Sequence, residues 1–273
     1  MLAISGRDRV HWLAVAGLVA ACNGIASHLL AAFADRGVVG AIASTGGVNP
    51  IFWFAMFAVL TMAFEPAAGR PLSRADRLVV GTVVMLAMLP VVSTGSLGVL
   101  IAGGWLVWTG ARGSRDRRVG VVLLALTASL IWGHFALMLL GDRIVSLDGG
   151  FVGWLAGTTA QGNLVSFSDG GRPMLIAYGC SSMHNITMAL QFWAATTQLL
   201  RIPFGLRSLL VALAAVVANV FVNGLRLATL AHNQAEFDYW HVGGGGALFA
   251  WLAVAAVVVT VMVGFHASAP RRV

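Results

Sequence analysis

Long apolar runs alternate with short polar segments along the whole chain, and the polar segments are rich in Arg, Gly, Pro and Asp. Uncharged runs of this kind are typical of helices that cross a lipid bilayer, for which about 20 residues are needed. The pattern predicts an all-α fold, a polytopic helical bundle of about eight transmembrane helices. The predicted spans are Leu13–Phe33, Pro50–Phe64, Leu78–Val92, Leu97–Thr109, Val119–Leu140, Met174–Leu200, Ser208–Leu230 and Val242–Phe265.

The third and fourth spans are short, and they could instead form one helix. A single helix over Leu78–Ala111 would be roughly 50 Å long at about 1.5 Å per residue, which is more than one crossing uses. The sequence therefore predicts a helical hairpin that turns at Ser93-Thr94-Gly95-Ser96.

The arginines give an independent test of this layout, because cytoplasmic loops of membrane proteins carry an excess of positive charge. With the N-terminus inside, the outer segments hold only four arginines, Arg36, Arg143, Arg172 and Arg226. The inner segments hold the other 13 of the 17, namely Arg7, Arg9, Arg70, Arg74, Arg77, Arg112, Arg115, Arg117, Arg118, Arg201, Arg207, Arg271 and Arg272. This bias predicts eight spans with both termini cytoplasmic, and the first span is expected to be an uncleaved anchor.

Composition narrows the class of protein further. Of the 273 residues, 59% are apolar and 10% are charged, whereas about a quarter of a soluble domain is charged. This excludes an ordinary cytosolic enzyme, a disordered chain and a nucleic-acid binder, and it makes membrane lipids the expected surroundings. We expect residues 1–273 to form a single integral-membrane domain. The outward loop 141–173 contains Phe151, Trp154 and Leu155 and is expected to form a short interfacial or re-entrant helix.

Polar side chains within spans are informative because burying them in a bilayer is costly. In the sixth span, Cys180, Ser181, His184, Thr187 and Gln191 occur together, and four of them have the spacing i, i+4, i+7, i+11 of one helical stripe. The seventh span has a second stripe, and a histidine opens the eighth span ahead of four glycines. These residues are Asn219, Asn223 and Arg226, then His241 and Gly243–Gly246.

The predicted topology places Cys180, Arg226 and His241 at one depth, on the outer side. A thiol near a helix N-terminus and an arginine has its thiolate favoured and becomes a usable nucleophile. Arg226 offers donors for the oxyanion of a tetrahedral intermediate, and His241 can transfer a proton. Each residue also has a simpler interpretation, as apolar filler, headgroup anchor or solvated histidine. The other cysteine, Cys22, has no partner pattern, and two cysteines so far apart exclude a disulfide framework and a CxxC metal or redox site.

At these residues the sequence resembles the exosortase/archaeosortase family of polytopic membrane cysteine transpeptidases. The ordered set is Cys180-Ser181, then Asn223-Gly224-Leu225-Arg226, then His241 with Gly244 three residues later. The resemblance covers most of the chain and implies a catalytic part at 174–265 together with the outer loop 141–173.

The resemblance also implies roles and partners. Cys180, Arg226 and His241 would be catalytic, with Ser181, His184, Asn219 and Asn223 supporting them. The substrates would be exported proteins with a C-terminal motif, an apolar helix and a basic tail, cut at the outer face of the bacterial inner membrane. No cofactor or metal is expected.

Two departures concern the substrate subsite. The family usually has Ser-Gly after the cysteine, where this chain has Ser181-Ser182, and an acidic residue before it, where this chain has Ala177-Tyr178-Gly179. A Pro-Glu-Pro substrate motif is therefore not expected. Two alternatives remain, a membrane acyltransferase using the same cysteine, and a small transporter or channel with the Asn219/Asn223/Arg226 stripe lining an anion path. Polar residues are sparse in the inner halves of the spans, which disfavours the transporter.

Overall fold

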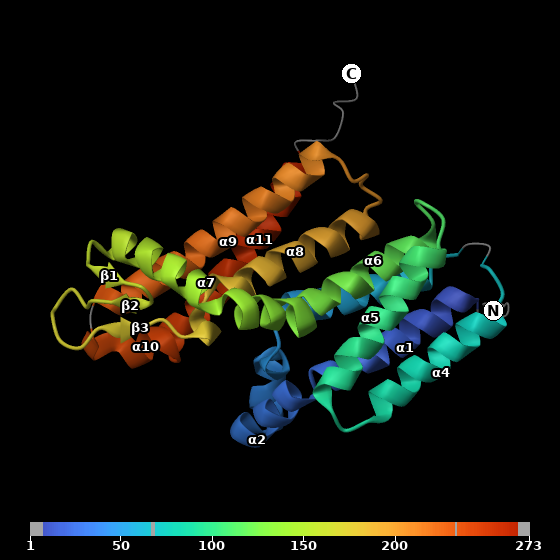
Figure 1. Ribbon diagram of the computed structural model, residues 1–273, viewed down its shortest axis with the longest axis horizontal. Helices are drawn as coiled ribbons and strands as arrows, with labels where there is room; N and C mark the ends of the chain where they lie inside the picture. Colours follow the sequence, from blue (N-terminus) through green and yellow to red (C-terminus); the bar gives the residue numbers. More distant parts are fainter. Residues whose placement is uncertain (1–7, 67–68, 233, 267–273) are drawn as a thin grey trace. The chain divides into compact units, whose positions relative to one another are not determined.

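The computed structural model describes residues 8–66, 69–232 and 234–266, and nearly all of them are helical (Figure 1). The prediction of an all-α fold is confirmed. Three of the predicted inner arginines, Arg7, Arg271 and Arg272, lie outside the described residues. Tertiary contacts divide the chain into two compact units, one of Met1–Trp132 with Ala194–Phe204 and one of Gly133–Trp193 with Gly205–Val273. Most of the predicted catalytic part belongs to the second unit.

The first unit is a helical bundle in which apolar side chains are fully buried, among them Leu13, Leu106 and Leu123. Its α5 and α6 approach closely at two glycines, since a Cβ on Gly103 would lie 3.0 Å from the Gly120 carbonyl oxygen. Such small-residue contacts are common where helices pack in membranes. The elements are α1 (Arg9–Gly24), α2 (Ala26–Ala43), η1 (Thr45–Gly47), α3 (Pro50–Ala63), α4 (Arg74–Met88), α5 (Val92–Thr109), α6 (Arg115–Thr127) and a π-helical turn, η2 (Ala128–Trp132).

The predicted hairpin between the third and fourth spans exists, but its turn was placed too late. Helix α4 ends at Met88 and α5 begins at Val92, so the turn is made around Pro90. A proline disfavours helical geometry in the residue before it, and it has no N–H to donate, which ends α4. The predicted turn residues, from Ser93 to Ser96, lie in the first turns of α5, where the Thr94 hydroxyl donates to Leu86 O and Val91 O.

The predicted first span is also not one straight helix. It breaks at Ile25, where α1 and α2 meet at an angle of 49°. Just before the break, the Asn23 side chain donates to the backbone oxygens of Ala87 and Leu89 at the end of α4, at 2.8 Å each. The asparagine thereby ties the end of α1 to the α4 turn, while α2 leaves in a new direction.

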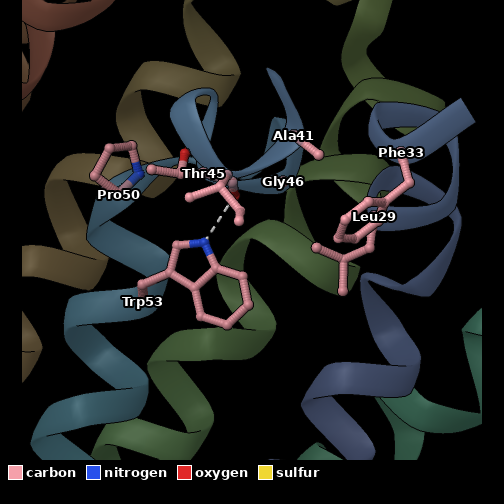
Figure 2. Close-up of a pocket in the computed structure, with 8 residues that line it drawn as sticks. Leu29, Phe33, Ala41, Thr45, Gly46, Pro50 and Trp53 are labelled. Carbon is pink, nitrogen blue, oxygen red and sulfur yellow. Dashed lines mark hydrogen bonds between the residues drawn. The ribbon is translucent and has the colours of Figure 1, made fainter. Parts of the chain in front are cut away.

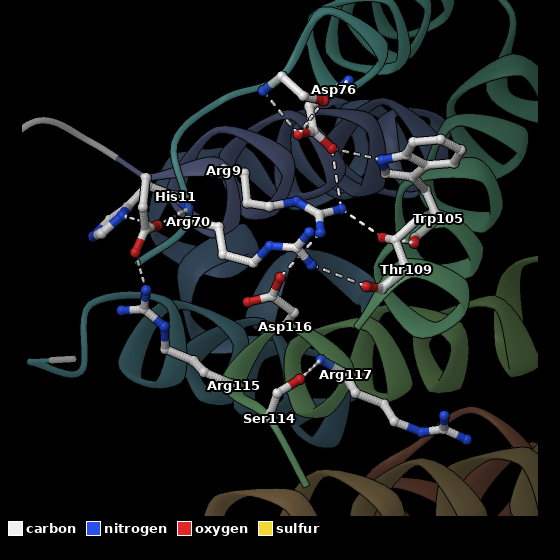
Figure 3. A network of polar contacts seen from close by, with 12 residues as sticks. Arg9, His11, Arg70, Asp76, Trp105, Thr109, Ser114, Arg115, Asp116 and Arg117 are labelled. Carbon is white, nitrogen blue, oxygen red and sulfur yellow. Dashed lines mark hydrogen bonds and ion pairs between the residues drawn. The ribbon is translucent and has the colours of Figure 1, made fainter. Parts of the chain in front are cut away.

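Four helical ends of the first unit meet in a buried ionic network (Figure 3). The Arg9 guanidinium, at the start of α1, lies 3.0 Å from Asp76 of α4 and 3.2 Å from Asp116 of α6. It also donates to the Thr109 hydroxyl at the end of α5, and Trp105 Nε1 donates to Asp76 at 2.8 Å. The Arg9 side chain is 3% exposed, so these contacts take place away from solvent.

Replacing Arg9 with Met is expected to destabilise the protein by about 3–5 kcal/mol, because two buried carboxylates then lose their cation. The measurement is the loss of helical circular dichroism on heating purified protein in detergent. The matched control is Arg112→Met, since Arg112 is exposed. Equal melting temperatures for the two variants would show that the network contributes little.

The second unit consists of long helices and a small sheet. Its elements are α7 (Gly133–Ala156), β1 (Ala160–Gln161), β2 (Leu164–Val165), β3 (Met174–Leu175), η3 (Tyr178–Cys180), α8 (Ser182–Leu199), α9 (Leu206–His232), η4 (Gln234–Glu236), α10 (Phe237–His241) and α11 (Gly244–His266), of which α8 ends in the first unit. The strands are antiparallel in the order β1-β2-β3. Side chains from the strands and from α7 and α9, including Val152, Val165, Ile176 and Leu227, form the core.

Within the described ranges, four helical runs are long and apolar enough to cross a membrane, or five if the bent α1–α2 pair counts as one span. They are Val92–Thr109, Arg115–Ala156, Leu206–His232 and Gly244–His266. The run from Arg115 to Ala156 extends well beyond the predicted end at Leu140. Residues 141–156 of the predicted outer loop are therefore helical, and Phe151, Trp154 and Leu155 lie on α7.

Candidate thiol–imidazole site

The segment that carries Cys180 is not helical, which corrects the predicted start of the sixth span at Met174. Residues Met174 and Leu175 pair with β2, and Ile176 N donates to Asn163 O at 2.8 Å. Cys180 ends a 3-10 turn, and the α8 helix begins two residues later, at Ser182. Ser181, between this turn and α8, has an extended backbone, so the predicted stripe from Cys180 to Gln191 is not one helical face.

Cys180 and His241 lie together, as predicted. The Cys180 Sγ atom is 3.6 Å from His241 Nε2, within hydrogen-bonding distance for sulfur, and both residues are half-buried. His241 is the last residue of α10, and its ring lies against that of Phe237 with centroids 5.0 Å apart. The thiol–imidazole contact joins residues 61 positions apart in the sequence.

Helix α9 contacts the backbone of both residues. The Asn223 side chain donates to Cys180 O at 3.1 Å, and one turn later Arg226 donates through a terminal nitrogen to His241 O, also at 3.1 Å. Arg226 Nε is buried and has no hydrogen-bond partner. A buried donor without a partner costs free energy. The Nε–H group of Arg226 is therefore free to bind an acceptor near the thiol and the imidazole.

The other predicted supporting residues differ in burial and in their hydrogen-bond partners. Asn219 is fully buried on α9 and donates to Asn185 O at 3.0 Å, which ties α9 to α8. Ser181 is 1% exposed, and its hydroxyl oxygen has no hydrogen-bond partner. His184 is exposed on α8, whereas Thr187 and Gln191 are buried. The structure therefore brings Asn223 and Ser181 to the site more directly than His184.

Two acidic residues of α7 were missed by the sequence analysis. Asp148 accepts the backbone N–H of Ser182 at 2.9 Å, and Asp142 accepts the hydroxyl of Tyr178 at 2.7 Å. Both lie within the segment expected to be an outer loop. The one signal in the sequence is Asp148 within an otherwise apolar stretch, and nothing there indicates its partner.

The first unit has a cavity of about 400 Å³ of a different character (Figure 2). Its polar groups are bonded locally, since Trp53 Nε1 donates to Thr45 O at 3.0 Å and the Thr45 hydroxyl donates to Ser44 O and Val48 O. No Cys, His, Asp, Glu, Arg or Lys is among the residues that line it, so its one hydroxyl, that of Thr45, has no base beside it. Its lining is Leu29, Phe33, Ala41, Ile42, Thr45, Gly46, Pro50 and Trp53.

Metal binding has no candidate residues in the part of the chain that the structure describes, since no three His, Cys, Asp or Glu side chains there are grouped to hold an ion. Both cysteines are free thiols, Cys22 on the exposed side of α1 and Cys180 at the site.

Comparisons with protein-family models, with curated proteins and with solved structures gave no match to this chain. The site therefore has to be interpreted from its own geometry.

Proposed function

We propose that this chain is an integral-membrane cysteine peptidase or transpeptidase with exosortase-like chemistry. Its substrates are exported proteins whose C-terminal sorting signal has a motif, an apolar helix and a basic tail. It acts at the outer face of the bacterial cell membrane. The observation that carries the proposal is the 3.6 Å contact between Cys180 Sγ and His241 Nε2, with Arg226 bonded to the backbone of that histidine.

The proposed reaction uses these three side chains in order. The thiol proton passes to His241 Nε2 as the sulfur attacks the carbonyl carbon of the scissile peptide bond. Arg226 donates to the oxyanion that forms, and its unpaired Nε–H is the donor available for this. The intermediate collapses, the C–N bond breaks, and the leaving amine takes the proton from His241. Water or an amine then attacks the thioester on Cys180, releasing an acid or a new amide and restoring the thiol.

The proposal includes eight membrane crossings with both termini cytoplasmic. The arginine bias supports it, and so does the geometry of the first unit. In the first unit, the starts of α1, α4 and α6 meet the end of α5 at the Arg9 network, as alternating crossings require. Helix α3 has only 14 residues and would cross where the bilayer is locally thin.

The alternatives use the same residues differently. A transporter requires the polar stripe of α9 to face a path, but Asn219 and Asn223 are buried and their amides donate to backbone oxygens. A membrane acyltransferase uses the same thiol on a lipid ester, and it differs in product. Cleavage of a tailed protein supports the peptidase, whereas transfer of a radiolabelled acyl chain to Cys180 supports the acyltransferase.

Labelling of intact cells with a membrane-impermeant maleimide tests the proposal. We expect Cys180 to react at neutral pH in a Cys22→Ser background, because the thiol faces outward beside an imidazole. Replacing His241 with Ala in the same background should slow the reaction. A thiol that reacts only after the membrane is opened would contradict the outward site.

Replacing Arg226 with Lys should slow cleavage of a tailed substrate at least tenfold, which corresponds to about 1.4 kcal/mol of barrier or more. Loss of one oxyanion donor typically costs on the order of 100- to 1,000-fold, and an ammonium cannot reproduce the planar fork of a guanidinium. The measurement is turnover in membranes at matched enzyme levels, with the exposed outer residue Arg143→Lys as control. Asn223→Ala should give a weaker defect. Normal turnover of the Lys variant would leave Arg226 as a headgroup anchor.

A further inference from the structure

Asp148 is a buried carboxylate that belongs to none of the proposed chemical steps. It lies on α7, is 7% exposed, and accepts the backbone N–H of Ser182 through Oδ2 at 2.9 Å. Ser182 is the first residue of α8, and the first N–H groups of a helix have no partner within the helix. A carboxylate there satisfies a donor and interacts favourably with the helix dipole.

The usual local cap is not used at this helix start. A serine that precedes a helix commonly accepts an N–H from the first turn, and Ser181 occupies that position. Its hydroxyl oxygen, however, is buried without a hydrogen-bond partner. The cap comes instead from Asp148, 34 positions earlier in the sequence. The start of α8 is thus fixed to α7 rather than to its own preceding residue.

Helix α7 also holds the other side of the cysteine segment. Asp142 accepts the Tyr178 hydroxyl at 2.7 Å, and a Cβ on Gly141 would lie 2.9 Å from the ring of Tyr178. The hydrogen bond to Asp142 and its negative charge raise the pKa of Tyr178, so the phenol keeps the proton that it donates. Cys180 therefore lies between two attachments to α7, of which only the one at Asp148 is buried.

We propose that Asp148 is a positioning residue that holds the Cys180 thiol against His241 by capping α8. Its importance for catalysis rests on the proposed function, but its effect on the thiol does not. Without the carboxylate, the N–H of Ser182 is buried and unpaired, and the backbone of 180–182 must shift to reach another acceptor. The 3.6 Å contact between sulfur and imidazole is then lost.

The test is the pH midpoint of Cys180 alkylation by an impermeant maleimide, in a Cys22→Ser background. The midpoint is used rather than the rate, because a looser segment changes exposure as well as ionisation. The titratable group in contact with the thiol is His241 from α10. The charged groups bonded to the adjoining backbone are Arg226 from α9, at His241 O, and Asp148 itself from α7, at Ser182 N. Removing His241 should raise the midpoint, since the imidazole in contact with the sulfur can accept the thiol proton.

Asp148→Ala has two effects that shift the pH midpoint of alkylation in opposite directions, so the direction of the measured shift decides between them. Loss of a nearby negative charge alone would lower the midpoint. Loss of positioning raises it, and we expect a rise of at least half of that caused by His241→Ala. The double variant Asp148→Ala/His241→Ala should show no further rise, because the contact is already lost. An unchanged or lowered midpoint in Asp148→Ala would overturn the proposal.

Three further variants test whether the shift of the midpoint comes from loss of the hydrogen bond between Asp148 and Ser182. Asp148→Asn keeps an acceptor oxygen and should restore the wild-type midpoint or lower it. Ser182→Pro removes the donor instead of the acceptor, and proline is favoured at the first helical position, so it should raise the midpoint even if Asp148→Ala fails to insert. Asp142→Ala removes the exposed attachment and should have less than half the effect, whereas an equal rise would overturn the special role of Asp148.

The readout also separates this proposal from the function. Alkylation needs no substrate, so a raised midpoint in Asp148→Ala without any cleavage by the wild-type protein would support the positioning role and contradict the peptidase. Cleavage by the wild type with an unchanged midpoint in Asp148→Ala would support the peptidase and contradict the positioning role.

Discussion

Replacing Cys180 with Ser or Ala is expected to abolish cleavage of a tailed substrate while the protein still inserts into the membrane. Removing the nucleophile of a hydrolytic site costs roughly 10⁶-fold in turnover. The serine hydroxyl is a far weaker nucleophile than a thiolate and needs a dedicated base. The measurement is cleavage in membranes, with enzyme levels matched by immunoblot and folding checked by detergent stability.

The matched control is Cys22→Ser, because Cys22 lies on an exposed position of α1 in the first unit. We expect its activity to be nearly that of the wild type. Loss of activity in the Cys22 variant combined with retention in the Cys180 variants would move the nucleophile to the other unit.

Replacing His241 with Ala is expected to slow cleavage by about 100- to 10,000-fold, the range typical of general acid–base catalysis. Among the candidate histidines, His241 has its Nε2 atom 3.6 Å from the thiol. His184 is exposed on α8, and His232 contacts the Ser168 hydroxyl at 3.4 Å. Single Ala substitutions at all three positions should show the largest loss at His241, with normal membrane insertion.

A second substitution distinguishes a proton-transfer role from a structural one. His241→Asn keeps a polar side chain at this position but cannot transfer the proton, so it should lose about as much activity as His241→Ala. A larger loss at His184 than at His241 would transfer the role to α8.

The site was predictable from the sequence where it depends on helix order. Cys180, Arg226 and His241 lie next to predicted span ends, which is why the sequence predicted that they would be near one another, and the structure shows His241 in contact with both. The turn at Pro90 was not predicted, because Ser93, Gly95 and Ser96 are also residue types that are common in turns. The non-helical segment before Ser182 was missed because apolar content alone cannot separate a buried strand from a helix.

The hydrogen bond made by Asp148 could not have been predicted from the sequence. Its contact with Ser182 depends on α7 continuing to Ala156 and on the sheet returning the chain to α7, and neither feature has a local signature. Helix caps are usually found from neighbouring residues, so a cap supplied from a distant helix escapes a search of the sequence. The same reasoning explains why Asn223 was predicted only as a supporting residue, without its bond to the cysteine backbone.

The two bonds from α9 have a consequence for how the site tolerates motion. Asn223 and Arg226 lie three residues apart on one rigid helical turn, and each holds the backbone of one member of the reactive pair. A shift of this turn would therefore act on the backbone of the cysteine and of the histidine together. The same linkage makes the register of α9 critical, because one residue inserted between Asn223 and Arg226 turns the second side chain by about 100° around the helix axis. The spacing of these two residues along α9 thus helps to set where the sulfur and the imidazole lie.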